Sequence, residues 1–168
     1  NTATGYGALE ANTSAEYNTA TGYATLANNT TGTGNTATGY SALFYNTVGF
    51  QNTVAGYQAL HGNTSGAQNT CMGSVSLIVN STGHNNVGIG YASLGLNTTG
   101  FQNVAVGANA LYNTTTGSNN SGDWMRSCLS SLRLCQRRKQ RTKRSCAKPY
   151  SARSRRASLM ILSSTPGM

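Results

Sequence analysis

The sequence predicts an all-β fold, a β-solenoid (β-roll) of seven 17-residue coils over residues 1–121, followed by a basic tail of low order over residues 122–168. The pattern Asn-Thr-Ala-Thr-Gly-Tyr-x-Ala-Leu-x-x-Asn-Thr-Thr-Gly-x-x passes seven times through residues 1–119. So strict a period means that each unit packs mainly on its neighbours. Frequent Thr, Asn and Gly disfavour a long helix, and turn signals arrive too often for one to develop.

Three slots of the unit keep their residue in all seven copies and set the register. The first Asn recurs at Asn1, Asn18, Asn35, Asn52, Asn69, Asn86 and Asn103. The Gly four positions later recurs at Gly5, Gly22, Gly39, Gly56, Gly73, Gly90 and Gly107. The Leu recurs at Leu9, Leu26, Leu43, Leu60, Leu77, Leu94 and Leu111. We expect the asparagines to stack at a turn as a ladder of hydrogen-bonded amides, and the leucines to form the main buried ladder.

The first element expected in each unit is a strand over Thr-Ala-Thr, because Thr suits a strand and the flanking Asn and Gly favour turns. Thr2 and Thr4 correspond to Val87 and Ile89 in the sixth unit, while the residue between them stays small in most units. Side chains alternate across a strand. The small residue should therefore face a narrow interior, and the β-branched pair should face the opposite side.

The second element expected is a short strand over Tyr-x-Ala-Leu, so that each coil would hold two or three strands. Coils about 4.8 Å apart would give a rod roughly 33 Å long, with few apolar side chains per coil. Such a rod needs its Val/Thr or Tyr face to pack on another chain. The tyrosines could stack on a glycan or a protein, and a subunit interface is the interpretation we favour. They are Tyr6, Tyr23, Tyr40, Tyr57 and Tyr91.

A resemblance to a known family follows from these motifs. Asn86-Val-Gly-Ile-Gly90 and Asn103-Val-Ala-Val-Gly107 resemble the Asn-x-Val/Ala-x-Ile-Gly motif in the left-handed β-roll heads of trimeric bacterial autotransporter adhesins. The longer form, which starts Asn35-Thr-Ala-Thr-Gly-Tyr, is similar to repeats of bacterial surface proteins and phage tail fibres. The resemblance implies a homotrimer that adheres to a host surface protein or glycan, and an extracellular location on a bacterial cell or virion.

No residue pattern points to catalysis, to a cofactor or metal, or to a small-molecule substrate. His61 and His84 occupy variable slots without recurring acidic partners, and Glu10 and Glu16 occur only in the first unit. Cys71 takes a slot that is otherwise small, so we expect a buried structural thiol. The Asn-x-Ser/Thr sequons recur because the same turn of the unit recurs, so together they count as one feature. They include Asn12, Asn29, Asn63, Asn80, Asn97 and Asn113.

The tail differs from the repeats in composition. All twelve Lys and Arg lie between residues 126 and 156, and residues 137–144 form a basic run suited to phosphate contacts. Nucleic acid is therefore a partner only if the tail is native. Residues 122–125 must be encoded GGN-GAY-TGG-ATG, and advancing one base gives Ala, Val, Glu or Gly, then Ile or Thr, then Gly, which includes the Ala-Ile/Thr-Gly that the repeat requires. One extra base near codon 121 would make the tail an out-of-frame product, and the coding DNA tests this.

Three functions remain from the sequence. The leading one is a structural, adhesive repeat module of a surface adhesin or tail fibre. The second is an ice- or crystal-binding array of threonines, and the third is nucleic-acid binding through the tail. The chain begins at Asn1, in the middle of the pattern and without Met or a signal peptide, which indicates a fragment.

Overall fold

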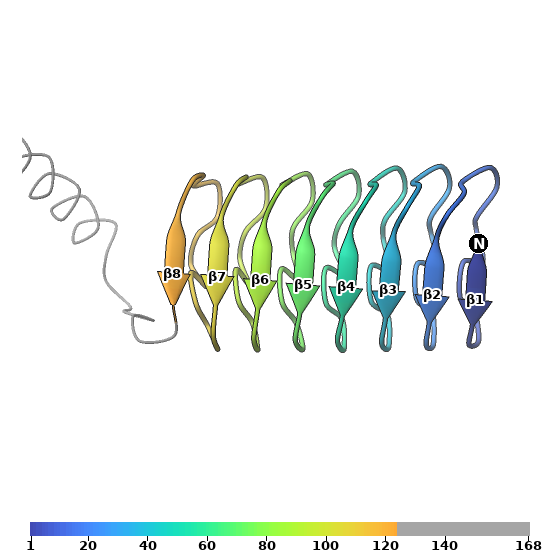
Figure 1. The fold of residues 1–168 in the computed structure, drawn as a ribbon, viewed down its shortest axis with the longest axis horizontal. Coiled ribbons are helices and arrows are strands. Elements are labelled where there is room, and N and C mark those ends of the chain that lie inside the picture. The colour runs from blue at the N-terminus through green and yellow to red at the C-terminus, as the bar shows by residue number, and fades with distance from the viewer. Residues whose placement is uncertain (124–168) are drawn as a thin grey trace, which may run out of the picture. The chain divides into compact units, whose positions relative to one another are not determined.

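A computed structural model describes residues 1–123 as a parallel β-solenoid, and residues 124–168 lie outside the described part. Every coil contributes one strand of three residues, and the strands pair in sequence order as one parallel sheet (Figure 1). Partners are always one 17-residue unit apart, as in Thr2 opposite Thr19. The strands are β1 (Thr2–Thr4), β2 (Thr19–Thr21), β3 (Thr36–Thr38), β4 (Thr53–Ala55), β5 (Thr70–Met72), β6 (Val87–Ile89), β7 (Val104–Val106) and β8 (Ser121–Asp123). The predicted solenoid is confirmed.

The prediction of a second strand in each coil is wrong. The Tyr-x-Ala-Leu segment forms turns, in which the x residue and the Leu both adopt left-handed backbone, as at Ser41 (φ 49°) and Leu43 (φ 55°). A left-handed Leu costs about 1–2 kcal/mol, whereas burying its side chain gains about 1.5–3 kcal/mol. Leu43 is fully buried. The gain from burial therefore offsets the strain, and the chain reverses here instead of extending.

The interior of the solenoid is narrow and filled by small residues and leucines. The middle residue of each strand from β2 to β7 is buried while its neighbours face outward, which confirms the predicted facing of the strand. Cys71 occupies one of these middle positions and is completely buried. The leucines Leu26, Leu43, Leu60, Leu77 and Leu94 are fully buried, with Leu9 and Leu111 less so at the first and last coils.

The glycine that follows each strand is required by close approach of neighbouring coils. Gly73 has φ +131°, and a Cβ placed on it would lie 2.6 Å from the carbonyl carbon of Gly90 in the next coil. Only glycine adopts this backbone freely, and only glycine lacks the atom that would collide. The invariance of this slot thus reflects packing between coils.

The sheet continues beyond the predicted domain boundary at residue 121, because β8 pairs with β7 as far as Asp123. Gly122 takes the small interior slot beside Leu111, and Asp123 takes the outward slot opposite Val106. Apart from Gly122 and Asp123, the residues of the predicted basic tail, with its reading frame, lie outside the described range. Within residues 1–123, no helix is long and apolar enough to cross a membrane.

Candidate functional site

The first asparagine ladder ties each coil to the ones before and after it. Asn52 donates its backbone N–H and its Nδ2 to Oδ1 of Asn35, both at 3.0 Å. Its Nδ2 also donates to the carbonyl of Gly66, at 3.0 Å. Asn52 is fully buried, and the backbone contact recurs at every step from Asn18 to Asn120. The ladder therefore satisfies polar groups that water cannot reach.

A second asparagine ladder runs beside the first, at residues not singled out as a ladder in the sequence; all of them except Asn46 lie in sequons. Asn63 donates Nδ2 to Oδ1 of Asn46 at 2.7 Å and to the carbonyl of Gly66 at 2.9 Å. Gly66 thus accepts one amide from each ladder. The recurrence of Asn every 17 residues, including Asn46, which is not in a sequon, was the available signal. The buried, hydrogen-bonded amides at Asn29, Asn63, Asn80 and Asn97 are inaccessible to glycosylation.

The second ladder stops at Thr114, which occupies the slot of Asn97 one coil later. The backbone N–H of each donates to the leucine carbonyl three residues earlier, at 3.0 Å in both coils, so the local backbone is the same. Asn113 lies one position before the slot and is exposed. Among the described residues, Oδ1 of Asn97 is the one buried side-chain polar atom without a hydrogen-bond partner.

The tyrosine slot forms a stack in the first four coils only. The ring centroids of Tyr6, Tyr23, Tyr40 and Tyr57 lie 5.4, 5.1 and 5.4 Å apart, with interplanar angles of 7–14°. Ser74 takes the slot in the fifth coil. The predicted ladder therefore ends before Tyr91, which stands apart from the stack.

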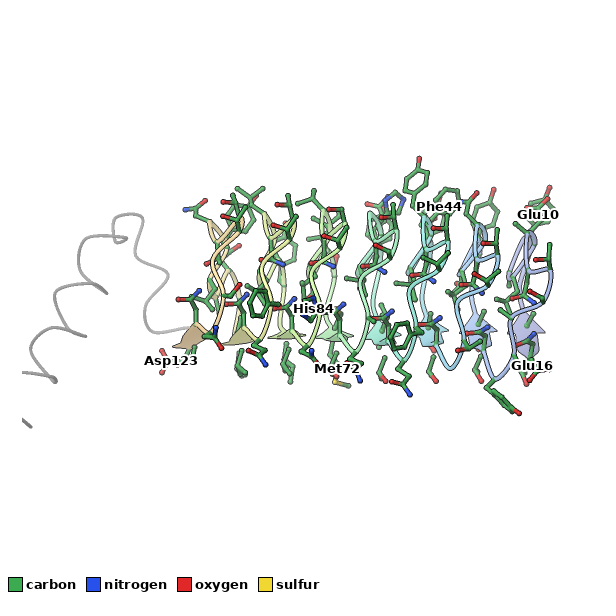
Figure 2. All side chains as sticks on the ribbon, turned by 90° about the horizontal axis from the view of Figure 1, so that it is seen from above. Glu10, Glu16, Phe44, Met72, His84 and Asp123 are labelled. Atoms are coloured by element: carbon green, nitrogen blue, oxygen red, sulfur yellow. The ribbon has the colours of Figure 1, made fainter. Side chains whose placement is uncertain are left out.

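An aromatic groove of about 670 Å³ runs along these first four coils. Its most buried lining residues, Ala24, Ala27 and Ser41, form the floor beside the tyrosine stack. The other lining residues are Tyr6, Gly7, Glu10, Ala11, Tyr23, Asn28, Tyr40, Phe44, Tyr45, Gln58 and His61. Glu10 and Phe44 project on the side of the solenoid opposite Met72 of the sheet (Figure 2). The groove and the strands therefore occupy different faces.

The charge of the groove is low. Residues 1–123 contain no Lys or Arg, and Glu10 is the single carboxylate that lines the groove. His61 stacks on Phe44 with centroids 5.3 Å apart and meets Tyr45 edge to face. Burial lowers the pKa of His61 below its ordinary value, so its imidazole is uncharged at neutral pH. The middle of the groove thus carries phenol, hydroxyl and amide groups without a formal charge.

The outward side chains of β1–β8 form a second exposed surface, which we call the outer sheet face. Over β1–β3 it consists of six threonines; β4 and β5 each pair one threonine with one apolar residue, and both outward residues are apolar in β6 and β7. Met72 and Val106 expose 48% and 45% of their surface, and Ile89 lies between them in register. The apolar half holds Ala55, Met72, Val87, Ile89, Val104 and Val106, which adjoin across neighbouring strands.

The remaining reactive side chains do not form a cluster. Burial raises the pKa of the Cys71 thiol far above its ordinary range, so it stays protonated and unreactive. His84 stacks on Phe101 and lies apart from His61. Residues 1–123 contain no group of three or more His, Cys, Asp or Glu placed to hold a metal ion. Comparison with protein-family models, curated proteins and solved structures finds no match to this chain.

Proposed function

We propose that the solenoid is a structural, adhesive repeat module of a bacterial surface adhesin or a phage tail fibre, which works at the cell surface or virion without catalysis. The observation that carries the proposal is the apolar half of the outer sheet face, where Met72, Ile89 and Val106 stand exposed in one row. A contiguous exposed apolar patch marks an interaction surface. The resemblance of the repeat to adhesin heads agrees with this assignment.

The partner proposed for the outer sheet face is a second and a third copy of this chain, in a homotrimer. Residues 1–123 carry no basic residue, and their three acids are Glu10, Glu16 and Asp123. Of these, only Asp123 belongs to the sheet, at its last strand. The rest of the face is therefore uncharged, so copies that meet through it neither repel one another nor bury an unpaired charge. Trimerisation leaves the groove on the opposite side free for a host or matrix surface.

Light scattering on the full chain tests the trimer. We expect a particle of three times 17.5 kDa. Ile89→Glu places a charge in the apolar half and should give a folded monomer, because the side chain points outward. Thr99→Glu, at an exposed turn position, is the matched control and should remain a trimer. A wild-type monomer at high concentration, or a trimer unaffected by Ile89→Glu, would contradict the proposal.

The threonine half of the outer sheet face supports a second candidate, binding to ice or another crystal. Thr19, Thr21, Thr36 and Thr38 are exposed and lie in two straight rows across β2 and β3. Within each row, threonines on neighbouring strands lie about 4.8 Å apart. The row through Thr38 ends at Ala55, whereas the row through Thr36 continues to Thr53 and Thr70. Thermal hysteresis that is lost in Thr21→Leu/Thr38→Leu would favour this candidate, and its absence at micromolar protein would reject it.

A further inference from the structure

We propose that the aromatic groove binds an uncharged oligosaccharide laid along the solenoid axis, an inference that rests on the proposed adhesive function. The groove extends over four successive coils, so its length suits a linear polymer. Tyr23 and Tyr40 expose about half of their surface beside the floor at Ala24 and Ser41. Sugars combine apolar C–H surface with hydroxyl groups, and a groove for them needs aromatic and polar partners together.

The tyrosine stack supplies both kinds of partner. Its centroid separations of 5.1–5.4 Å exceed the roughly 3.5–4 Å of close ring contact, and Tyr23 and Tyr40 keep about half of their surface exposed. Each ring also carries a phenol group that can donate and accept hydrogen bonds. Asn28 and Gln58 add amides to the lining. Over the first three coils the groove thus offers one stacked aromatic edge and one hydroxyl per coil, from Tyr6, Tyr23 and Tyr40.

The charge of the groove excludes an anionic polymer as the preferred ligand. A nucleic acid or a sulfated glycan requires Lys or Arg to neutralise it, and residues 1–123 have neither. Glu10 would repel such a ligand at the first coil, and His61 is uncharged at the fourth. An uncharged oligosaccharide needs no Lys or Arg to neutralise it and is not repelled by Glu10.

The backbone along the groove excludes an extended peptide that pairs as an extra strand. The N–H groups of Ala24, Ser41 and Gln58 already donate to the carbonyls of the preceding coil's tyrosine, at 2.8–2.9 Å. A strand added to a sheet needs free backbone donors and acceptors. The ligand must therefore be held by side chains.

Isothermal titration calorimetry on the full chain tests the assignment. The probes are neutral linear hexasaccharides of glucose, of N-acetylglucosamine and of mannose, with a sulfated heparin hexasaccharide for comparison. At least one neutral probe should bind with a millimolar or tighter dissociation constant. The double variant Tyr23→Ala/Tyr40→Ala should weaken that binding about tenfold. Tyr91→Ala is the matched control, since it occupies the same slot outside the groove, and should leave binding unchanged.

Three results would overturn the assignment: no binding by any neutral probe, tighter binding by the heparin hexasaccharide, or equal loss in Tyr91→Ala. Circular dichroism verifies that each variant is folded. Light scattering on the same samples separates this inference from the proposed trimer. A trimer that binds no sugar rejects only the groove, whereas a monomer that binds sugar rejects only the trimer. Dissociation of the trimer by Tyr23→Ala/Tyr40→Ala would show that the groove is a subunit interface and would reject the sugar site.

Discussion

At the scale of single residues, buried asparagine amides decide how tightly one coil binds the next. Asn63 makes two hydrogen bonds through Nδ2 and accepts a third at Oδ1 from Asn80, all with complete burial. A buried polar group left without a partner costs about 1–3 kcal/mol, more than one hydrogen bond gains. Loss of a single asparagine therefore destabilises a ladder most, because the neighbouring buried amides are left without a partner.

Thr114→Asn should extend the second ladder by one step and stabilise the protein. The new Nδ2 would meet the unpaired Oδ1 of Asn97 and could also reach the carbonyl of Gly117, as its counterparts do. We expect a gain of about 1 kcal/mol, which raises the melting temperature by a few degrees. Thr116→Asn, at an exposed position of the same turn, is the control and should change little. If both substitutions raise the melting temperature equally, the stabilisation does not come from pairing Oδ1 of Asn97.

His61 should make stability depend on pH between neutrality and mild acid. Burial lowers its pKa in the folded chain, so the unfolded chain binds the proton more readily and protonation favours unfolding. The melting temperature should therefore fall as pH drops from 7.5 to 5.5. His61→Phe keeps a ring in the slot that Phe44 fills one coil earlier, and should flatten this slope. An unchanged slope would assign the pH dependence to another group.

At the scale of the coil, sequence reasoning succeeded for the strand and failed for the turn. Alternation between Thr and Ala in β2 and β3 predicted which side chains face inward. It could not predict left-handed backbone at Leu43, because no intrinsic preference of leucine favours it. That conformation arises from closing the coil and burying the side chain, which are tertiary effects. The glycine after each strand was recognised as invariant, but its reason is contact with the next coil.

Glycine substitutions separate backbone strain from collision between coils. Gly34→Ala meets its nearest new neighbour 3.6 Å away, at Gln51, and should cost about 1 kcal/mol for a left-handed alanine. Gly73→Ala adds a collision with the backbone of Gly90 to the greater strain of a φ of +131°, and should cost more than about 3 kcal/mol. Urea denaturation measures both changes. Similar costs for the two variants would mean that neighbouring coils yield to the extra methyl group.

At the scale of the whole solenoid, the period predicted the architecture, but the candidate site depends on departures from the period. Phe44, Tyr45 and His61 line the groove through slots that hold different residues in other coils. That they line one groove with Tyr6, Tyr23 and Tyr40 could be seen only in the structure, because several slots from four coils converge there. The end of the stack at Ser74 was already readable from the repeat register. Repetition thus builds the scaffold, and variation at a few slots gives one segment its own chemistry.

Removal of one complete unit should leave a shorter folded solenoid. Deleting residues 52–68 joins Gln51 to Asn69 and restores the register of the strands and of the first asparagine ladder across the junction. Because each coil contacts only its neighbours, the remaining coils should keep their packing with a modest loss of stability. Deleting residues 52–60 removes about half a unit and shifts every later slot, so buried asparagines would oppose the wrong partners. Circular dichroism should show a cooperative melt for the first deletion and none for the second. A comparable loss of structure in both would mean that the solenoid depends on contacts beyond neighbouring coils.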